Sequence, residues 1–315
     1  MTKKTASAST LAVKLAEHHA GLSYNRIPAA GRHAMKRLLL DYIGVAIAGS
    51  QSESGIIARE YAAQQGKAAE ATLIGGRGRV PMAAAAFANA ISCHSIELDD
   101  IDVLALFHFS PPVFSPALAV GEAVGASGKD LITALASGCE VMERVSQAAN
   151  NDLRNRAFHT TPTCGVFGAT AAAGKLLKLT PAKLTSAFGL AGAQASGLME
   201  MYGPSMQKRF NPGPAARNGV TAAQLARLGF TGADTIFEGE RGFLRAFAGR
   251  EKAGAEIVRS LNKPFELRIE FKPYSCARPI HNAIDCALEI RKQHAPDLKN
   301  IRSIVVRRHP DWSHY

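Results

Sequence analysis

The sequence lacks the long apolar and strongly basic segments that mark membrane and nucleic-acid-binding proteins. No stretch reaches the roughly 18 consecutive apolar residues of a membrane helix, and the polar residues 1–7 contain no apolar core of a secretory signal. The net charge is +11, but the basic residues form no long run, and aromatics make up only 7% of the chain. We therefore expect a cytoplasmic protein with no membrane or nucleic-acid partner, whose charge serves a small anionic substrate.

Cysteines are also few. The chain has five of them, at Cys93, Cys139, Cys164, Cys276 and Cys286. Their number is odd, their spacing is wide, and they form no CxxC or zinc-finger pattern. We expect reduced thiols and no metal site built on cysteine.

Small and apolar residues are frequent in the composition of the chain. Hydrophobic residues make up 47% of the 315 residues, with many alanines and 28 glycines, a composition typical of closely packed helices. Because single cores stop growing beyond about 250 to 300 residues, we expect two unequal domains. The prediction is a mainly α protein, with an all-helical domain over residues 1–264 and the beginning of a smaller α/β domain over residues 265–315.

Apolar spacing and helix-starting residues give the expected elements. Helices are predicted over residues 28–50, 55–65, 81–93, 111–124, 130–148, 165–177, 181–199, 214–228 and 233–247, and residues 71–76 are expected to form an extended loop. The pattern changes near Pro264. A strand over residues 265–271, a helix over 280–293 and a strand over 301–307 would open an α/β unit.

Histidines stand in two of the predicted loops that lead into helices. His108 precedes Ser-Pro-Pro, and His159 precedes a helix start with hydroxyls at Thr160, Thr161 and Thr163. Histidine changes charge near neutral pH, and a helix N-terminus attracts carboxylates. We interpret His108 and His159 as catalytic and Thr160 as substrate-binding; the alternative is imidazoles satisfied by neighbouring carbonyl groups.

Acidic residues gather just before His108, at Glu97, Asp99, Asp100 and Asp102. Their spacing departs from a calcium loop, which needs a turn glycine and a terminal glutamate, so no metal is expected. We predict that Asp99 or Asp100 orients an imidazole and that Glu97 contacts substrate. The alternative is helix capping or solvation.

Basic residues stand at two further helix starts. Lys208 and Arg209 precede one of them, and Lys272 and His281 flank the expected domain junction. Cations next to free backbone N–H groups bind anions, and clefts between domains are common ligand sites. We predict that these four residues bind substrate; the alternative is a solvent-facing basic turn.

Six blocks, at residues 40–46, 94–100, 108–112, 158–161, 208–216 and 272–281, together resemble the MmgE/PrpD family. That family includes 2-methylcitrate dehydratases, cis-aconitate decarboxylases and an iminodisuccinate epimerase. The resemblance implies a large helical domain with a smaller α/β lid, a homodimer, no cofactor or required metal, and a small di- or tricarboxylate substrate. It also implies that His108 and His159 are active-site histidines and that Lys208 and Lys272 meet substrate carboxylates.

Several positions depart from the family pattern. Glu97 stands where many relatives have aspartate, Ile101 where threonine is frequent, Asn211 where histidine is common, and Ala277 where the decarboxylase branch has a histidine. We therefore expect a cofactor-independent hydro-lyase like 2-methylcitrate dehydratase, an enzyme of propionate catabolism. Epimerisation and decarboxylation are the alternatives. Because family members continue beyond residue 315, a truncated, non-catalytic paralogue that binds carboxylates or dimerises is the remaining alternative.

Overall fold

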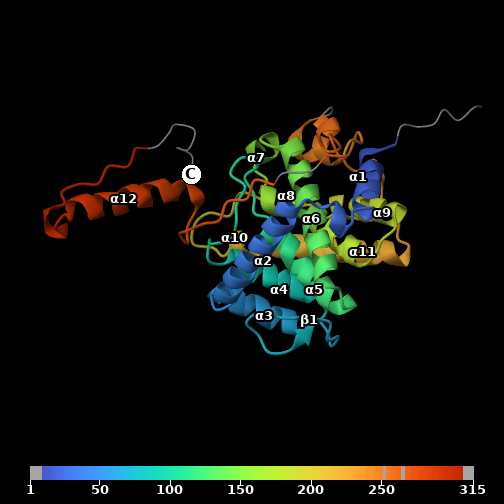
Figure 1. Ribbon diagram of the computed structural model, residues 1–315, viewed down its shortest axis with the longest axis horizontal. Coiled ribbons are helices and arrows are strands. Elements are labelled where there is room, and N and C mark those ends of the chain that lie inside the picture. Colours follow the sequence, from blue (N-terminus) through green and yellow to red (C-terminus); the bar gives the residue numbers. More distant parts are fainter. Residues whose placement is uncertain (1–8, 251–252, 264–266, 308–315) are drawn as a thin grey trace, which may run out of the picture.

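The computed structural model describes residues 9–250, 253–263 and 267–307, and these residues are mainly helical (Figure 1). The α-helices are α1 (Leu11–Ala20), α2 (Ala29–Gly49), α3 (Glu53–Ala63), α4 (Met82–His94), α5 (Ser115–Val124), α6 (Gly128–Ala149), α7 (Asp152–Asn155), α8 (Thr160–Leu176), α9 (Pro181–Gly192), α10 (Gln207–Phe210), α11 (Pro212–Leu228) and α12 (His281–His294). Two short strands, β1 (Ala71–Thr72) and β2 (Arg79–Val80), pair antiparallel. The predicted mainly α class is confirmed.

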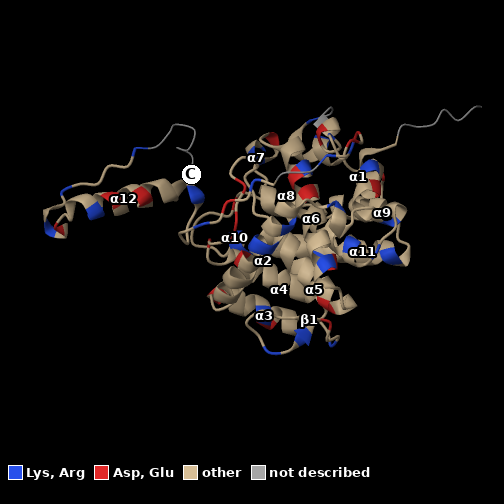
Figure 2. Cartoon of the chain, viewed as in Figure 1, with Lys and Arg blue, Asp and Glu red and all other residues tan. Residues whose placement is uncertain are grey.

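Helix α8 lies at the centre of the helical body. It packs against α6, α11, α9 and α5, and α4 joins the same core by packing against α11, α2, α3 and α5. Helix α4 has no charged residue apart from His94 at its end and is buried along nearly its whole length. In Figure 2 lysine and arginine are spread over many elements, whereas α4 is uncharged. A buried, uncharged helix therefore leads into the acidic block at residues 97–100.

Capping residues explain several helix boundaries. Ser127 and Asp130 form a reciprocal capping box at the start of α6, and Thr180 caps α9 by accepting a hydrogen bond from Lys183 N. Gly229 ends α11 in the left-handed conformation, with φ of 108°. The predicted starts at residues 130 and 181 therefore agree with the structure within two residues.

Two glycines allow α6 and α8 to approach closely. A Cβ atom added at Gly168 would lie 2.8 Å from the carbonyl oxygen of Gly138 and 2.9 Å from Cβ of Met142. Such distances are shorter than van der Waals contact, so the two helices would have to separate. The small residues in the sequence thus serve the central packing.

We expect Gly168→Ala to lower the free energy of unfolding by about 1–3 kcal/mol, because it overpacks the α6–α8 contact. Urea denaturation measures the change. Gly44→Ala is the matched control, since nothing lies within 4 Å of a Cβ there, and alanine is about 0.5–1 kcal/mol better than glycine inside a helix. Equal effects of the two substitutions would contradict the packing argument.

Two predicted helices in the body need correction. The helix predicted over residues 233–247 is wrong: turns occupy most of it, followed by a π-helical turn, Leu244–Ala248. Gly239 and Gly242 approach backbone atoms of residues 235–239 too closely for a Cβ, so the chain turns on itself there. Helix α9 ends at Gly192 rather than 199, and Gly197 follows with φ of 126°. Helix α1 was not predicted from the sequence.

The C-terminal part extends away from the helical body as α12 and the segment after it (Figure 1). The predicted helix over 280–293 is confirmed. Residues 264–266 lie outside the described residues, and the rest of the predicted strand over 265–271 makes only an isolated bridge between Glu270 and Ile101. Residues 301–307 are not a strand in the described structure, because no neighbouring segment pairs with them. The strand predicted over residues 301–307 is therefore wrong, and the strand predicted over 265–271 does not form in its described residues, 267–271. The domain boundary near 264 remains a prediction.

The two longest helices, α2 and α6, carry charged residues along their length. Among the residues that the structure describes, no helix is both long enough and apolar enough to cross a membrane.

Candidate active site

A cavity of about 520 Å³ lies between the helical body and the segment that leads to α12. Five residues predicted for the site line it: Glu97, His108, His159, Lys208 and Lys272. They come from the loops after α4 and before α5, from the start of α8, from α10 and from the C-terminal segment. Segments more than 170 residues apart in sequence therefore meet at one cavity.

The backbone fixes both histidines of the cavity. His159 precedes the first residue of α8, and its N–H donates to the carbonyl of Gly197 at 3.0 Å. The N–H of His108 donates to Oγ1 of Thr161 at 3.2 Å. Because Thr161 also belongs to α8, the first turn of this helix positions the backbone of both histidines.

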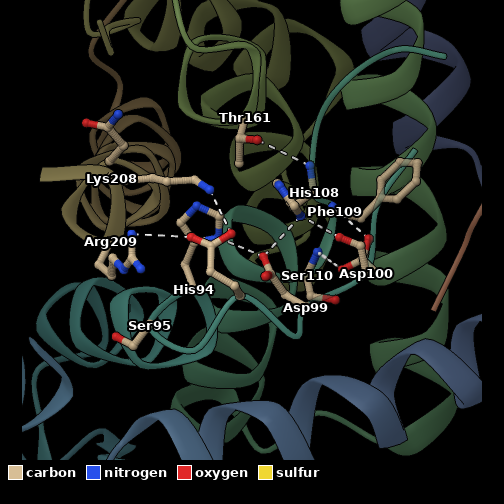
Figure 3. Close-up of polar contacts among 12 residues, drawn as sticks. His94, Ser95, Asp99, Asp100, His108, Phe109, Ser110, Thr161, Lys208 and Arg209 are labelled. Carbon is tan, nitrogen blue, oxygen red and sulfur yellow. Dashed lines mark hydrogen bonds and ion pairs between the residues drawn. The ribbon is translucent and has the colours of Figure 1, made fainter. Parts of the chain in front are cut away.

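Asp99 is the centre of the polar network shown in Figure 3. Its Oδ2 lies 2.7 Å from Nδ1 of His94 and 3.2 Å from Nδ1 of His108, and its Oδ1 lies 3.7 Å from Nζ of Lys272. The carboxylate is fully buried. Burial alone would raise its pKa, but His108, His94 and Lys272 together hold the pKa well below its usual range. Asp99 is therefore ionised at neutral pH.

Asp100 shapes the loop that carries His108. Its two carboxylate oxygens each accept a backbone N–H at 2.9 Å, from Phe109 and Ser110 (Figure 3). Its carbonyl oxygen lies 2.5 Å from Nδ1 of His108. Burial raises the pKa of Asp100 to about 6, with Ser110 acting against this shift and Asp99 adding to it. The side chain faces the backbone and not the cavity, so its geometry suits a structural role.

The two cavity histidines are held neutral. Burial lowers the pKa of His108 to about 3, although Asp99 acts in the opposite direction. Burial also lowers the pKa of His159 well below its usual value, and the neighbouring His94 and His108 add to the effect. A neutral imidazole has one donor and one acceptor nitrogen, so each ring can donate one hydrogen bond and accept another at neutral pH.

Cations surround Glu97 at the cavity wall. Its carboxylate lies 2.7 Å from Nζ of Lys208 and 3.3 Å from a guanidinium nitrogen of Arg209. Nζ of Lys272 donates to the Glu97 carbonyl at 3.0 Å. Burial would raise the pKa of Glu97, but His94 and Lys208 lower it below its usual value. The backbone of Glu97 lies in the left-handed region, with φ of 58°, which is uncommon for a residue other than glycine.

The sequence matches the MmgE/PrpD N-terminal domain over residues 13–256. The chain belongs to the MmgE/PrpD family. It is 35% identical to the cis-aconitate decarboxylase-like protein oryM of Aspergillus oryzae over 305 residues, which cover 89% of this chain and 62% of that protein. It is 31% identical to the cis-aconitate decarboxylase of Aspergillus terreus, covering 98% and 66% of the two chains, and 31% identical to that of Homo sapiens, covering 82% and 54%. The chain thus spans 54% to 66% of the length of these relatives.

Besides Asp99 and Asp100, three residues that were predicted to bind substrate in this MmgE/PrpD protein lie away from the cavity lining. Thr160 is fully buried, and its Oγ1 donates to Asn150 at 3.4 Å. A guanidinium nitrogen of Arg209 lies 3.3 Å from the carboxylate of Glu97. His281 is 1% exposed, with Nε2 3.3 Å from the Cys276 carbonyl and its ring against Tyr274. In this structure none of these three residues is among those that line the cavity.

Two residues of this MmgE/PrpD site had no predicted role. His94, at the end of α4, bonds Asp99 and lies with its ring centroid 4.9 Å from that of His108. Asn211, between α10 and α11, lies 3.1 Å from Nδ1 of His159. The position of His94 five residues before Asp99 was the available signal for the first; no local pattern indicated the second.

Metal-ligand atoms also cluster here, since those of His94, Asp99 and His108 lie within 4.8 Å of one another. The ammonium of Lys272 faces the same carboxylate, and its positive charge would oppose a divalent cation. The arrangement therefore fits a hydrogen-bonded network better than a metal centre.

Proposed function

We propose that this chain carries the acid/base site of a cofactor-independent lyase that acts on a small di- or tricarboxylate. The observation that carries the proposal is the pair of neutral imidazoles, His108 and His159, that line one cavity together with Lys208 and Lys272. Proton transfer by positioned histidines contributes typically about 10²–10⁴-fold to a rate. Ammonium groups stabilise the negative charge that develops next to a carboxylate.

The charges of the cavity favour a substrate with more than one carboxylate. Besides the two lysines, the side chains of Arg154 and Arg278 line the cavity, whereas Glu97 is its lining carboxylate among the described residues. A substrate carboxylate can replace Glu97 at Lys208, because that ion pair lies at the cavity wall. A volume of about 520 Å³ is enough for a small polycarboxylate.

Decarboxylation of a cis-aconitate-like acid is our first candidate, because the relatives reported above are cis-aconitate decarboxylases or resemble them. In that reaction one carboxylate leaves as carbon dioxide and its bonding electrons move through the double bond. The carbon at the far end of the double bond then takes a proton. The site needs one proton donor and cations for the remaining carboxylates.

Dehydration of a 2-methylcitrate-like hydroxy acid is the second candidate, and Ala277 favours it. This residue lines the cavity, so the wall has a methyl group where the decarboxylase branch is expected to have an imidazole. Dehydration needs a base that removes a proton next to a carboxylate and an acid that protonates the departing hydroxyl, which leaves as water. Two imidazoles supply both roles.

Incubation of the purified protein with cis-aconitate, 2-methylcitrate, citrate and iminodisuccinate in deuterated water, followed by NMR, tests the proposal. We expect one of the first two acids to be consumed with deuterium entering a carbon-bound position of product or substrate. Carbon dioxide release identifies decarboxylation, and new olefinic ¹³C signals without it identify dehydration. Tricarballylate, which has neither a double bond nor a hydroxyl, is the matched control and should give no product.

The outcome that overturns the enzyme proposal is an absence of turnover and exchange with all four acids. If the acids then raise the thermal unfolding temperature, the chain binds carboxylates without catalysis, which was the alternative for a short paralogue. Exchange into iminodisuccinate alone would replace the lyase by an epimerase.

A further inference from the structure

Asn211 lies beside the imidazole of His159 and is not among the residues that line the cavity. Its Nδ2 lies 3.1 Å from Nδ1 of His159. Both residues are buried, with exposed fractions of 6% and 3%. Asn211 joins α10 to α11, so two helices fix its position beside the imidazole. This contact decides which ring nitrogen of His159 carries the proton.

The surroundings of Asn211 define the orientation of its amide. The same Nδ2 lies 3.4 Å from the carbonyl oxygen of Leu198 and 3.2 Å from Sδ of Met201. Both atoms are acceptors. Rotating the amide by half a turn would place Oδ1 against a carbonyl oxygen and a thioether sulfur, which have no proton to share. Nδ2 therefore donates, and Nδ1 of His159 accepts.

His108 is held in the opposite way. Its Nδ1 lies 2.5 Å from the carbonyl oxygen of Asp100 and 3.2 Å from Oδ2 of Asp99. A carbonyl oxygen only accepts, so Nδ1 of His108 must be the donor in its contact with Asp100. Nδ1 of His108 therefore carries the proton, and its Nε2 has a free lone pair.

We propose that Asn211 is a positioning residue that locks His159 in the Nε2–H tautomer, so that the cavity is served by one imidazole donor, His159, and one imidazole acceptor, His108. The tautomers follow from contacts alone. Their catalytic consequence rests on the proposed function. In a dehydration, Nε2 of His108 takes the substrate proton and Nε2–H of His159 protonates the departing hydroxyl; the proton on His108 then returns to His159 through water. In a decarboxylation only His159 acts: its Nε2–H protonates the product carbon, and water restores the proton.

The tautomers can be read directly by NMR. In protein labelled with ¹⁵N-histidine at neutral pH, long-range proton–nitrogen spectra separate protonated from unprotonated ring nitrogens, and His108→Gln and His159→Gln variants assign the two rings. We expect Nδ1 unprotonated in His159 and Nε2 unprotonated in His108. A spectrum with Nδ1 of His159 protonated would overturn the proposal.

Asn211→Asp replaces the amide donor by a carboxylate acceptor of the same shape. We expect Nδ1 of His159 to become protonated while the pattern of His108 is unchanged, which also shows that the loop of His108 stays folded. Asn218→Asp is the matched control, because Asn218 lies in α11, the helix that starts after Asn211, and contacts Arg217 instead of a histidine. It should leave the protonation patterns of His108 and His159 as they are. An unchanged His159 in Asn211→Asp would contradict the role of Asn211.

Activity gives the second readout. Asn211→Asp should lower kcat at least ten-fold with the substrate that the wild-type protein turns over, and Asn218→Asp should not. Asn211→Leu, which removes the donor without adding an acceptor, should give an intermediate loss and a mixed tautomer signal. If the wild-type protein turns over no carboxylate, the proposed function fails, whereas the tautomer assignment still stands or falls by the spectra. Full activity of Asn211→Asp with an inverted tautomer would overturn the assignment of His159 as the acid.

Discussion

Asp99→Asn is expected to slow turnover or deuterium exchange of the accepted carboxylate by roughly 10²- to 10⁴-fold, the range that positioned acid/base groups contribute to a rate. Asp99 accepts from His94 and His108 and faces Lys272. An amide that keeps its oxygen toward the two rings turns its NH₂ group toward the ammonium of Lys272, and it carries no charge to pair with that ammonium. The measurement is the initial rate by NMR at neutral pH.

Thermal unfolding separates this loss from simple destabilisation. Breaking one side of a buried ion pair costs about 3–5 kcal/mol, so Asp99→Asn should also unfold at lower temperature and is assayed well below that point. Asp234→Asn, at an exposed position, is the matched control and should keep the wild-type rate. A folded Asp99→Asn variant with the wild-type rate would remove Asp99 from the site.

Glu143→Gln is expected to stabilise the protein at alkaline pH by on the order of 2–4 kcal/mol, since one pKa unit corresponds to about 1.4 kcal/mol. Glu143 is 1% exposed on α6. Burial raises its pKa to about 8, and Asp102 adds to this rise against the smaller effects of Gln147 and Arg268. The uncharged amide can still accept the hydrogen bond that Gln147 donates to Oε1 at 2.5 Å.

The pH dependence of this gain has a defined sign. Between the ordinary glutamate value of 4.5 and about 8, folded Glu143 keeps a proton that the unfolded chain has lost, so this residue lowers stability as pH rises through that window. The advantage of Glu143→Gln should therefore be absent below pH 4.5 and complete above pH 8. Urea unfolding at three pH values measures it, and exposed Glu60→Gln on α3 serves as control. An equal gain at every pH would contradict the assignment.

The helices of the body were predictable because their signals are local. Proline, serine, threonine and aspartate at the starts, and apolar residues at helical spacing, gave the approximate positions of most helices from α2 to α11. The prediction failed at residues 233–247, where backbone turns around Gly239 and Gly242 replace a helix. It also failed at residues 301–307, because a strand needs a partner that the sequence pattern cannot supply.

The site was predictable in composition and not in arrangement. His108, His159, Lys208 and Lys272 were selected from their loops and their family resemblance, and the structure places all four at one cavity. Thr160 had the same local signal as His159 but lies in the first turn of α8 without lining the cavity. Burial of one side chain in a helix turn depends on the helices packed around it, and those contacts have no local signature.

The sequence by itself determined the helical class, the family and the titratable residues that line the candidate site, because these depend on composition, spacing and residue chemistry. The tertiary structure alone decided which groups share hydrogen bonds: Asp99 between two imidazoles, and Asn211 behind His159. Residues 99 and 272, or 159 and 211, come within a few ångströms only after the helices pack. A proton's position on a ring is set by that contact and by exclusion of water around it, so no local reading of the chain could have assigned it.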